Sequence, residues 1–397
     1  MNSRMSLLCF MGLGLACGSE MTEPPNTNPT TNNNAATNNN AANNNAENNN
    51  TVTPPPPAGL PVLGRNSHDV NKIEFTWMTN NSTPLDLPRD IAFNPEKPAE
   101  LWIVNTGDES TTVIQDLDME TEEVVRYKSF GSEHFLAKPS ALAFGANGTW
   151  ASIHETDELT QGPNGTPEDF MGPTLWTANL DDFDSGHGSH MDMLHNSPLG
   201  MGIAWDVDNV YWVFDGHNSS ITRYDFNQDH GLGGSDHSDG FISRYAEGEV
   251  QRSADVPSHM EMDRTTHMLY AADTGNNRIA RLDTTSGTQG GRIFPNYDGI
   301  NQFKMNDAVL DTFIDGSMFG MQAPSGLAIK DGVLYVGDNN LSTIYAFDLE
   351  NGELLDFVAL PITPGGMMGL DLSQDGDLYG VDSVSERVFR LRAIPEE

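Results

Sequence analysis

Residues 269–283 read Leu269-Tyr-Ala-Ala-Asp-Thr-Gly-Asn-Asn-Arg-Ile-Ala-Arg-Leu-Asp283, which predicts two short β-strands joined by a tight turn. From Ile279 to Asp283 the residues alternate between two faces of a strand, so one face packs against a neighbouring sheet. Gly275-Asn276-Asn277 between the strands contains residues that tolerate the positive φ of a tight hairpin. The stretch therefore predicts the middle of an antiparallel sheet.

The same pattern recurs along the chain, which predicts a repeat architecture. Each unit opens with a short apolar segment and continues with a strand closed by a polar residue. The opening segments start at Arg89, Ser140, Met201, Ser258, Ser325 and Met368. The following strands end at Asn105, His154, Asp215, Asp273, Asp338 and Asp382. Six units of this kind predict an all-β fold, a six-bladed β-propeller.

Residues 269–283 resemble the core of an NHL repeat, and the other five units resemble it more loosely. The resemblance covers about residues 70 to 397, implies the six-bladed propeller, and says little about function. It also implies that the Asp at the end of the second strand is structural. We therefore expect turn caps, not catalytic groups, at Asp215, Asp273, Asp338 and Asp382.

The last unit supplies only three strands before the sequence stops at Glu397. Asn71-Lys-Ile-Glu-Phe-Thr-Trp77, ahead of the first unit, has the length of a strand and no unit of its own. We expect it to pair as the outer strand of the final blade. Such pairing closes the ring and removes an exposed sheet edge.

The N-terminus is typical of a signal peptide, with Arg4 followed by an apolar stretch, residues 5–16, that is too short to span a bilayer. Gly14-Leu15-Ala16-Cys17-Gly18 resembles the lipobox of bacterial lipoproteins, although the family usually has an aliphatic residue in place of Gly14. The resemblance implies that residues 1–16 are a lipoprotein signal peptide and that Cys17 is lipidated. The alternative is ordinary secretion, with Cys17 a spare thiol.

Residues 17–64 form an Asn- and Pro-rich linker that has little to bury, so we expect a disordered tether ahead of a propeller at residues 65–397. Cys9, the only other cysteine, lies in the predicted signal peptide, so the mature fold contains no disulfide. We expect a lipid anchor in the outer membrane of a Gram-negative-type bacterium, with the propeller facing the periplasm or the cell surface.

The charge balance excludes some partners. The chain has 57 Asp and Glu against 20 Lys and Arg, a formal net charge of -37. No basic surplus exists to displace the counterions of nucleic acid, and attraction to anionic lipid is excluded for the same reason. We expect a monomer that contacts the membrane through its lipid anchor only.

Histidines are concentrated in one part of the chain, since most of the 11 lie between His187 and His267. Imidazoles with nearby carboxylates are ligands of zinc and other transition metals. The alternative is a set of solvated loop histidines, because tight ligand spacing is missing. The candidate metal ligands are His195, His217, His230, His237 and His259.

A second candidate is the loop that begins at Asp225. Asp225, Asn227 and Asp229 alternate as in a calcium loop, and Asp236 stands at its twelfth position. Gly231 falls one residue later than the turn-making glycine of an EF-hand, so an irregular calcium or metal loop and a plain acidic loop both remain open. The two candidate sites could be one, because His230 and His237 belong to this loop.

Known propeller enzymes offer two further patterns. Peptidyl-amidating lyases place His after Pro at the start of inner strands, where this chain has Pro139-Ser140, Pro257-Ser258 and Pro324-Ser325. Calcium-dependent lactonases place Asn before Gly-Leu, where this chain has Ser325. We therefore expect a module that binds or scaffolds a protein or small ligand at the propeller's loop face. The alternative is a metal-dependent lyase or hydrolase with a His-rich site at the channel, built on His259.

Overall fold

The computed structural model describes residues 59–128, 133–157, 170–183, 190–234 and 236–395. Cys17, the predicted signal peptide and the tether up to residue 58 lie outside the described residues. The described chain begins ahead of the expected boundary at residue 65. The 3-10 helix η1 (Pro61–Leu63) packs against the folded domain, because Val62 and Leu63 are buried in one apolar cluster with Ile73 and Leu360.

The described strands form six sheets, each running from an inner strand to an outer edge. The first three sheets consist of β2 (Pro88–Phe93), β3 (Leu101–Asn105), β4 (Ser110–Gln115) and β5 (Glu123–Tyr127); β6 (Pro139–Phe144), β7 (Thr149–His154), β8 (Thr174–Thr177) and β9 (His190–Met193); and β10 (Gly200–Trp205), β11 (Val210–Asp215), β12 (Ser220–Asp225) and β13 (Phe241–Tyr245).

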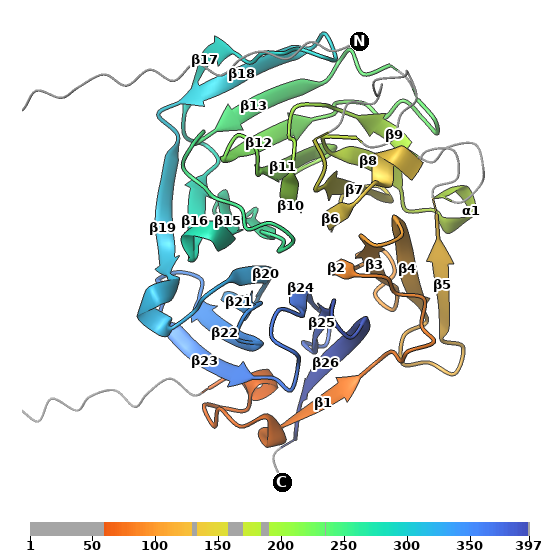
Figure 1. The fold of residues 1–397 in the computed structure, drawn as a ribbon, viewed down its shortest axis with the longest axis vertical. Coiled ribbons are helices and arrows are strands. Elements are labelled where there is room, and N and C mark those ends of the chain that lie inside the picture. Colours follow the sequence, from red (N-terminus) through yellow and green to blue (C-terminus); the bar gives the residue numbers. More distant parts are fainter. Residues whose placement is uncertain (1–58, 129–132, 158–169, 184–189, 235, 396–397) are drawn as a thin grey trace, which may run out of the picture. The chain divides into compact units, whose positions relative to one another are not determined.

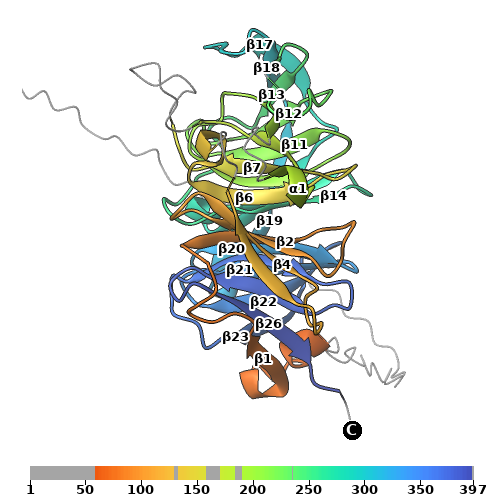
Figure 2. The ribbon, with the colours of Figure 1, turned by 90° about the vertical axis from the view of Figure 1, so that its right-hand side faces the viewer.

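The other three sheets follow the same plan. They consist of β14 (Met260–Asp263), β15 (Met268–Asp273), β16 (Arg278–Asp283) and β19 (Val309–Asp315); β20 (Pro324–Lys330), β21 (Val333–Asp338), β22 (Thr343–Asp348) and β23 (Leu354–Ala359); and β24 (Met367–Leu372), β25 (Leu378–Asp382), β26 (Arg387–Ala393) and β1 (Ile73–Trp77). Figure 1 shows these sheets as blades of a ring with the inner strands toward its centre, and Figure 2 shows the ring from the side. The predicted six-bladed propeller is confirmed.

The other described helices are single turns. They are η2 (Val70–Lys72), η3 (Glu133–Leu136), α1 (Leu180–Phe183), η4 (Thr274–Asn276) and η5 (Gly316–Phe319). Within the described residues, none of these helices is long and apolar enough to cross a bilayer.

Apolar side chains fill the spaces between neighbouring blades. Trp102 of the first blade lies 5.4 Å from Trp150 of the second, measured between ring centroids, and Trp150 stacks on Trp176 at 5.7 Å. All three indole rings are fully buried in one cluster with Phe183. Each strand alternates its side chains between two such spaces, which explains the strand patterns in the sequence.

The expected turn caps are present. Asp273 accepts hydrogen bonds from the Asn276 amide, the Arg278 guanidinium and the backbone N–H of Gln251. Asp338 accepts from the backbone N–H groups of Gln322, Ala323 and Leu341. Equivalent bonds from the next turn reach Asp215 and Asp382. These buried carboxylates therefore fix the turn after the second strand of their blades.

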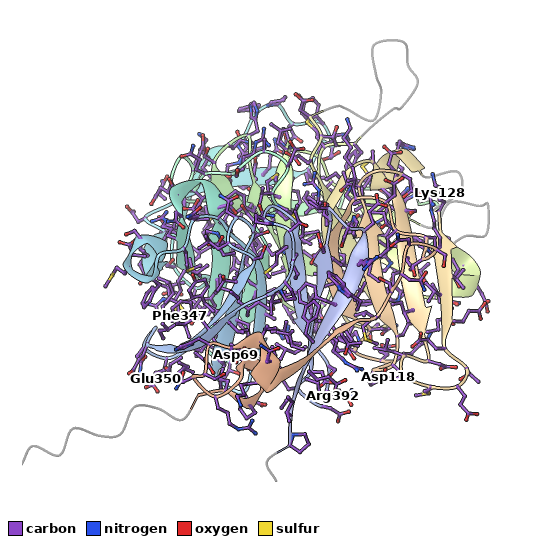
Figure 3. All side chains as sticks on the ribbon, turned by 60° about the horizontal axis from the view of Figure 1, so that its bottom comes forward. Asp69, Asp118, Lys128, Phe347, Glu350 and Arg392 are labelled. Atoms are coloured by element: carbon purple, nitrogen blue, oxygen red, sulfur yellow. The ribbon has the colours of Figure 1, made fainter. Side chains whose placement is uncertain are left out.

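The ring is closed by β1, as expected from the sequence. Ile73–Trp77 pairs antiparallel with β26, so the final blade takes its outer strand from the beginning of the folded chain. Asp118, in the first blade, bonds Arg390 at 2.6 Å and lies 3.3 Å from Arg392, both in β26. Figure 3 shows Asp118 and Arg392 close together at this junction.

The third blade carries two strands that the repeat does not predict. Between β16 and β19 the chain forms the hairpin of β17 (Thr288–Arg292) and β18 (Asn301–Asn306). Strand β18 pairs in parallel with β13, so the sheet of the third blade has six strands. The hairpin covers the outer edge of β13, which would otherwise expose unpaired backbone groups.

Candidate functional site

Two repeat positions of the inner strands meet at the axis of the ring, and small residues dominate both. The first position holds Asp90, Ala141, Gly202, His259, Gly326 and Gly369. The second position holds Ala92, Ala143, Ala204, Glu261, Ala328 and Asp371. A Cβ atom on Gly202 would lie 1.9 Å from the Ser258 carbonyl oxygen, so backbones approach too closely there for a side chain. The four charged or imidazole side chains are therefore exceptions in a crowded centre.

These four exceptions line one cavity, which we call the central cavity. Its volume is about 230 Å³, and inner-strand residues of all six blades line it. Phe93, Phe144 and Trp205 line it as well, each partly exposed. The lining residues that matter for its chemistry are Asp90, Phe93, Phe144, Trp205, His259, Glu261, Arg264 and Asp371.

Two of the carboxylates also hold blades together. Asp90 accepts the backbone N–H of Leu142, in the next blade, at 2.9 Å, and that of Ile91 at 2.8 Å. Asp371 accepts the N–H of Phe93, in the first blade, at 2.7 Å. Their presence at the axis therefore has a structural explanation of its own.

Glu261 has no such explanation, because its carboxyl forms no hydrogen bond with any residue that the structure describes. The nearby Arg264 is engaged elsewhere, with its guanidinium carbon 4.4 Å from the ring centroid of Trp205. Among the described lining residues, Arg264 is the only Lys or Arg. Glu261 is thus a carboxyl group that faces the central cavity without a counter-charge bonded to it.

Burial shifts the pKa of each of the four exceptions toward the value that favours the neutral form. It raises the pKa of Asp371 to about 6 and that of Asp90 well above the usual range. Burial and then the carboxyls of Asp371 and Asp90 raise the pKa of Glu261 well above its usual range. Burial lowers the pKa of His259 to about 4. The surroundings of the cavity therefore penalise negative charge.

His259 is the predicted candidate that reaches the axis. Its Nε2 lies 3.3 Å from the Ser140 carbonyl oxygen and 3.5 Å from Asp90 Oδ1. Its buried Nδ1 has no hydrogen-bond partner among the described residues. A proton on Nε2 leaves Nδ1 as an acceptor.

A network of ion pairs lies near the beginning of the inner strands, next to Asp90 in the sequence. Arg89 sits 3.4 Å from both Glu155 and Asp255, and Arg252 bonds Glu155 at 2.6 Å. Arg89 belongs to the first blade and Glu155 to the second, while Arg252 and Asp255 lie in the segment that connects the third blade to the fourth. The four residues pair with one another. Their charges are compensated, unlike those of the central cavity.

The other predicted histidines lie away from the central cavity, since none is among its described lining residues. His195 is buried and binds Asp298 through its backbone N–H at 2.9 Å and Nδ1 at 2.5 Å. Asp298 belongs to the β17–β18 hairpin, so this pair fastens the hairpin to the ring. His217 is exposed in the turn after β11.

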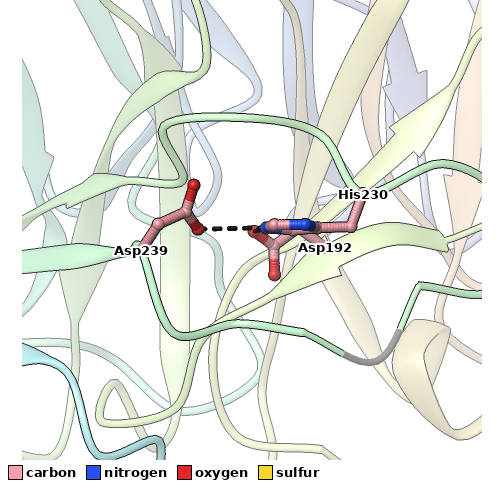
Figure 4. Close-up of side chains that lie close together, drawn as sticks. All are labelled: Asp192, His230 and Asp239. Carbon is pink, nitrogen blue, oxygen red and sulfur yellow. Dashed lines mark hydrogen bonds and ion pairs between the residues drawn. The ribbon is translucent and has the colours of Figure 1, made fainter.

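His230 and His237 do come together, around a carboxylate that the sequence did not single out. His237 Nδ1 lies 2.5 Å from Asp192 Oδ1, and His230 Nε2 lies 3.0 Å from Asp239 Oδ1. Figure 4 shows Asp192, His230 and Asp239 converging. Burial raises the pKa of Asp192, whose side chain is fully buried in β9.

The predicted calcium-loop carboxylates each serve a local turn. Asp225 accepts the N–H of Asn227, Asp229 that of Gly231, and Asp236 that of Ser238. None of the three belongs to a group of ligand atoms within 4.8 Å of one another among the described residues. The residues of this loop that do lie in such a group are His230 and Asp239.

A signal for the missed residues was present in the repeat. Asp90 occupies the same repeat position as His259, and Glu261 and Asp371 share a position that is otherwise alanine. Comparing each unit column by column would therefore have found all three. Asp192 and Asp239 leave no comparable signal, because they lie on an outer strand and in a long loop.

Comparisons with known proteins agree on the fold. No family model and no curated protein matches the sequence. An auxiliary nutrient binding protein from Bacteroides thetaiotaomicron VPI-5482 superposes with a TM-score of 0.52 at 12% identity, over 81% of this chain and 76% of that one. A luciferin-regenerating enzyme superposes with a TM-score of 0.52 at 11% identity, over 81% of this chain and 96% of that one. Streptogramin B lyase superposes with a TM-score of 0.50 at 11% identity, over 81% of this chain and 98% of that one. The chain is a six-bladed β-propeller, like these proteins.

Proposed function

We propose that this chain is an envelope-anchored binding module whose central cavity holds a small organic cation. The observation that carries the proposal is Glu261, a carboxyl group without a hydrogen-bond partner among the described residues, in a cavity that also contains Asp90 and Asp371. A cation bound there would favour ionisation of carboxyls that burial keeps neutral.

The aromatic lining supports an organic cation. Phe93, Phe144 and Trp205 line the same cavity as the carboxyls. Ammonium and guanidinium groups are attracted to the faces of aromatic rings, and Arg264 already uses Trp205 in this way. Aromatic rings and carboxylates together are the usual surroundings of a bound amine.

The spacing of the groups argues against a single metal ion in the central cavity. Among the described residues, its carboxylates and His259 do not form a group of three ligand atoms within 4.8 Å of one another. The cavity of about 230 Å³ is smaller than the roughly 300–1,000 Å³ of common ligand pockets. A small organic molecule fits the cavity volume and the spacing of its polar groups better than a metal ion does. A binding role is also supported by the similar fold of the auxiliary nutrient binding protein, a likeness that concerns the architecture alone.

The test is binding of ethanolamine, choline and putrescine to the purified full-length chain at pH 8, measured by isothermal titration calorimetry. We expect at least one amine to bind and Glu261→Gln to weaken it about 10- to 100-fold, since a charge-assisted hydrogen bond contributes about 1.5–3 kcal/mol. The control is Glu350→Gln, which removes an exposed carboxylate from the fifth blade. Binding should also weaken at pH 5, where Asp371, with its pKa of about 6, takes up a proton.

Two results would contradict the proposal. One is that none of the three amines binds the folded protein. The other is that an amine binds equally well to the wild type and to Glu261→Gln, because the cavity carboxyl would then make no contribution.

A further inference from the structure

Four side chains from two blades meet at a place remote from the central cavity. Asp192 lies on β9, the outer strand of the second blade. His230, His237 and Asp239 lie in the loop between β12 and β13 of the third blade. One oxygen of Asp192, His230 Nε2 and one oxygen of Asp239 all lie within 4.8 Å of one another, and the described residues contain no second group of three such ligands.

Asp192 is the unusual member of this group. Its side chain is fully buried, and its Oδ1 is bonded by His237 at 2.5 Å. Its Oδ2 has no hydrogen-bond partner among the described residues, although a buried carboxylate oxygen is costly to leave unsatisfied. His230 Nε2 lies 3.9 Å from Oδ2, too far for a hydrogen bond. None of the described residues satisfies this atom, which is therefore a ligand atom directed at the neighbouring His230 and Asp239.

The distances fit a bound metal ion. His230 Nε2 is 3.0 Å from Asp239 Oδ1 and 3.9 Å from Asp192 Oδ2. Metal–ligand bonds of about 2.0–2.2 Å in a tetrahedron separate the ligand atoms by roughly 3.3–3.6 Å. The two observed separations lie on either side of that value, so an ion between the three atoms requires only small side-chain movements.

We propose that Asp192, His230 and Asp239 bind one divalent transition-metal ion of the zinc type. An imidazole nitrogen among the donors favours zinc and its neighbours, whereas calcium prefers oxygen ligands throughout. Three protein ligands leave a fourth coordination position for water. His237 is a positioning residue, which holds Asp192 through Oδ1 and turns Oδ2 toward the ion.

The ion would add a side-chain connection between the second and third blades. Its ligands come from β9 on one side and from the β12–β13 loop on the other. Backbone bonds run between the same segments, from His230 N–H to the Met191 carbonyl and from Gly233 N–H to the His190 carbonyl. These bonds hold the loop against β9, so the ligands are arranged before an ion arrives.

The test uses the purified full-length chain, stripped of metal and titrated with ZnCl₂ or CaCl₂ by calorimetry. We expect one tightly bound Zn²⁺ per chain and weak or no Ca²⁺ binding. His230→Ala and Asp192→Asn should each weaken Zn²⁺ binding at least about 100-fold, and His237→Asn about 10-fold. The matched control is His217→Ala, which removes an exposed histidine of the same blade and should bind Zn²⁺ as the wild type does.

Three further measurements separate binding from folding. Zn²⁺ at 100 times its Kd should raise the melting temperature of the wild type by about 5 °C and leave that of His230→Ala unchanged. The His230 side chain is 20% exposed, so its removal should leave the fold intact by circular dichroism even where Asp192→Asn does not fold. Co²⁺ should give the visible absorption of a tetrahedral complex with the wild type only. The proposal is overturned if the folded wild type binds no Zn²⁺, or if His230→Ala binds it as tightly.

Discussion

At the scale of single residues, the chemistry of this propeller comes from departures within its repeat. Small residues stand at most axial positions because neighbouring inner strands approach closely there. Asp90, His259 and Glu261 break that rule and meet in the central cavity. A charged side chain in a low-dielectric centre costs free energy unless it is paired. Glu261, which bonds to none of the described residues, is therefore the strongest indication of a ligand.

The buried imidazole of His259 makes a prediction about pH. Its pKa is about 4 in the folded protein, because burial disfavours the charged form, and about 6.5 in the unfolded chain. Between pH 4 and pH 6.5 only the unfolded chain binds the proton. The stability that the neutral His259 allows is therefore fully present above pH 6.5 and is lost as the pH falls toward 4. We expect the wild type to lose about 3 kcal/mol more stability than His259→Asn between pH 7 and pH 4.

Urea unfolding at a series of pH values measures this difference. The comparison uses the slope of stability against pH, because the absolute stability of His259→Asn also reflects lost packing. His217→Asn is the control, since an exposed histidine should leave the slope unchanged. Parallel curves for the wild type and His259→Asn would show that His259 is not held neutral by burial.

At the scale of elements, the strand β1 closes the ring as the sequence predicts. Ile73 is buried, and the ring centroids of Phe75 and Trp77 lie 6.0 and 6.4 Å from that of Phe389 in β26. Thr79, just after β1, also accepts the N–H of Val388 through its hydroxyl oxygen. The strand therefore joins the two ends of the domain by backbone pairing and by apolar packing.

Deleting residues 65–78 should destabilise the whole domain. The loss of Ile73, Phe75 and Trp77 removes about 5 kcal/mol of apolar burial and exposes the edge of β26. We expect a fall in melting temperature of about 10 °C or more, measured by differential scanning calorimetry. Deleting residues 26–50 of the Asn-rich segment is the matched control and should leave the melting temperature unchanged. An unaltered melting temperature without residues 65–78 would contradict closure by β1.

The β17–β18 hairpin shows where the repeat pattern stops being informative. The sequence between β16 and β19 predicts only a long insertion, because its strands pair with a different blade. The pairing of β18 with β13 depends on contacts distant in sequence, such as the bond from the Asn196 amide to Gln302 at 2.7 Å. His195, a predicted metal ligand, fastens this insertion through Asp298.

At the scale of the whole molecule, the ring combines a rigid architecture with a strongly negative charge. Apolar clusters between neighbouring blades stabilise the ring. The formal net charge of -37 is in keeping with attraction of small cations toward the surface and the central cavity. The lipobox resemblance adds a proposed lipid anchor at Cys17, which would keep this surface at the membrane.

The anchor at Cys17 gives a prediction for the full-length protein in a bacterial host. We expect the wild type to incorporate labelled palmitate and to sediment with the outer membrane, because several acyl chains together hold a protein at a bilayer. Cys17→Ser should lose the label and leave the membrane fraction. Cys9→Ser is the control, since Cys9 lies in the predicted signal peptide. Sedimentation of Cys17→Ser with the membrane would contradict the lipoprotein assignment.

The propeller, the number of blades and the turn caps are predictable from the sequence, because each follows from a local pattern repeated along the chain. The closing strand is predictable too, because the last unit is one strand short. The sequence also placed His259 at the axis, since a histidine stood where other units have small residues. That Glu261 and Asp371 share the central cavity with His259 is seen only once the blades are assembled. The tertiary structure likewise brought Asp192 to His230 and Asp239, because those contacts join different blades, and no local pattern records which loop lies against which strand.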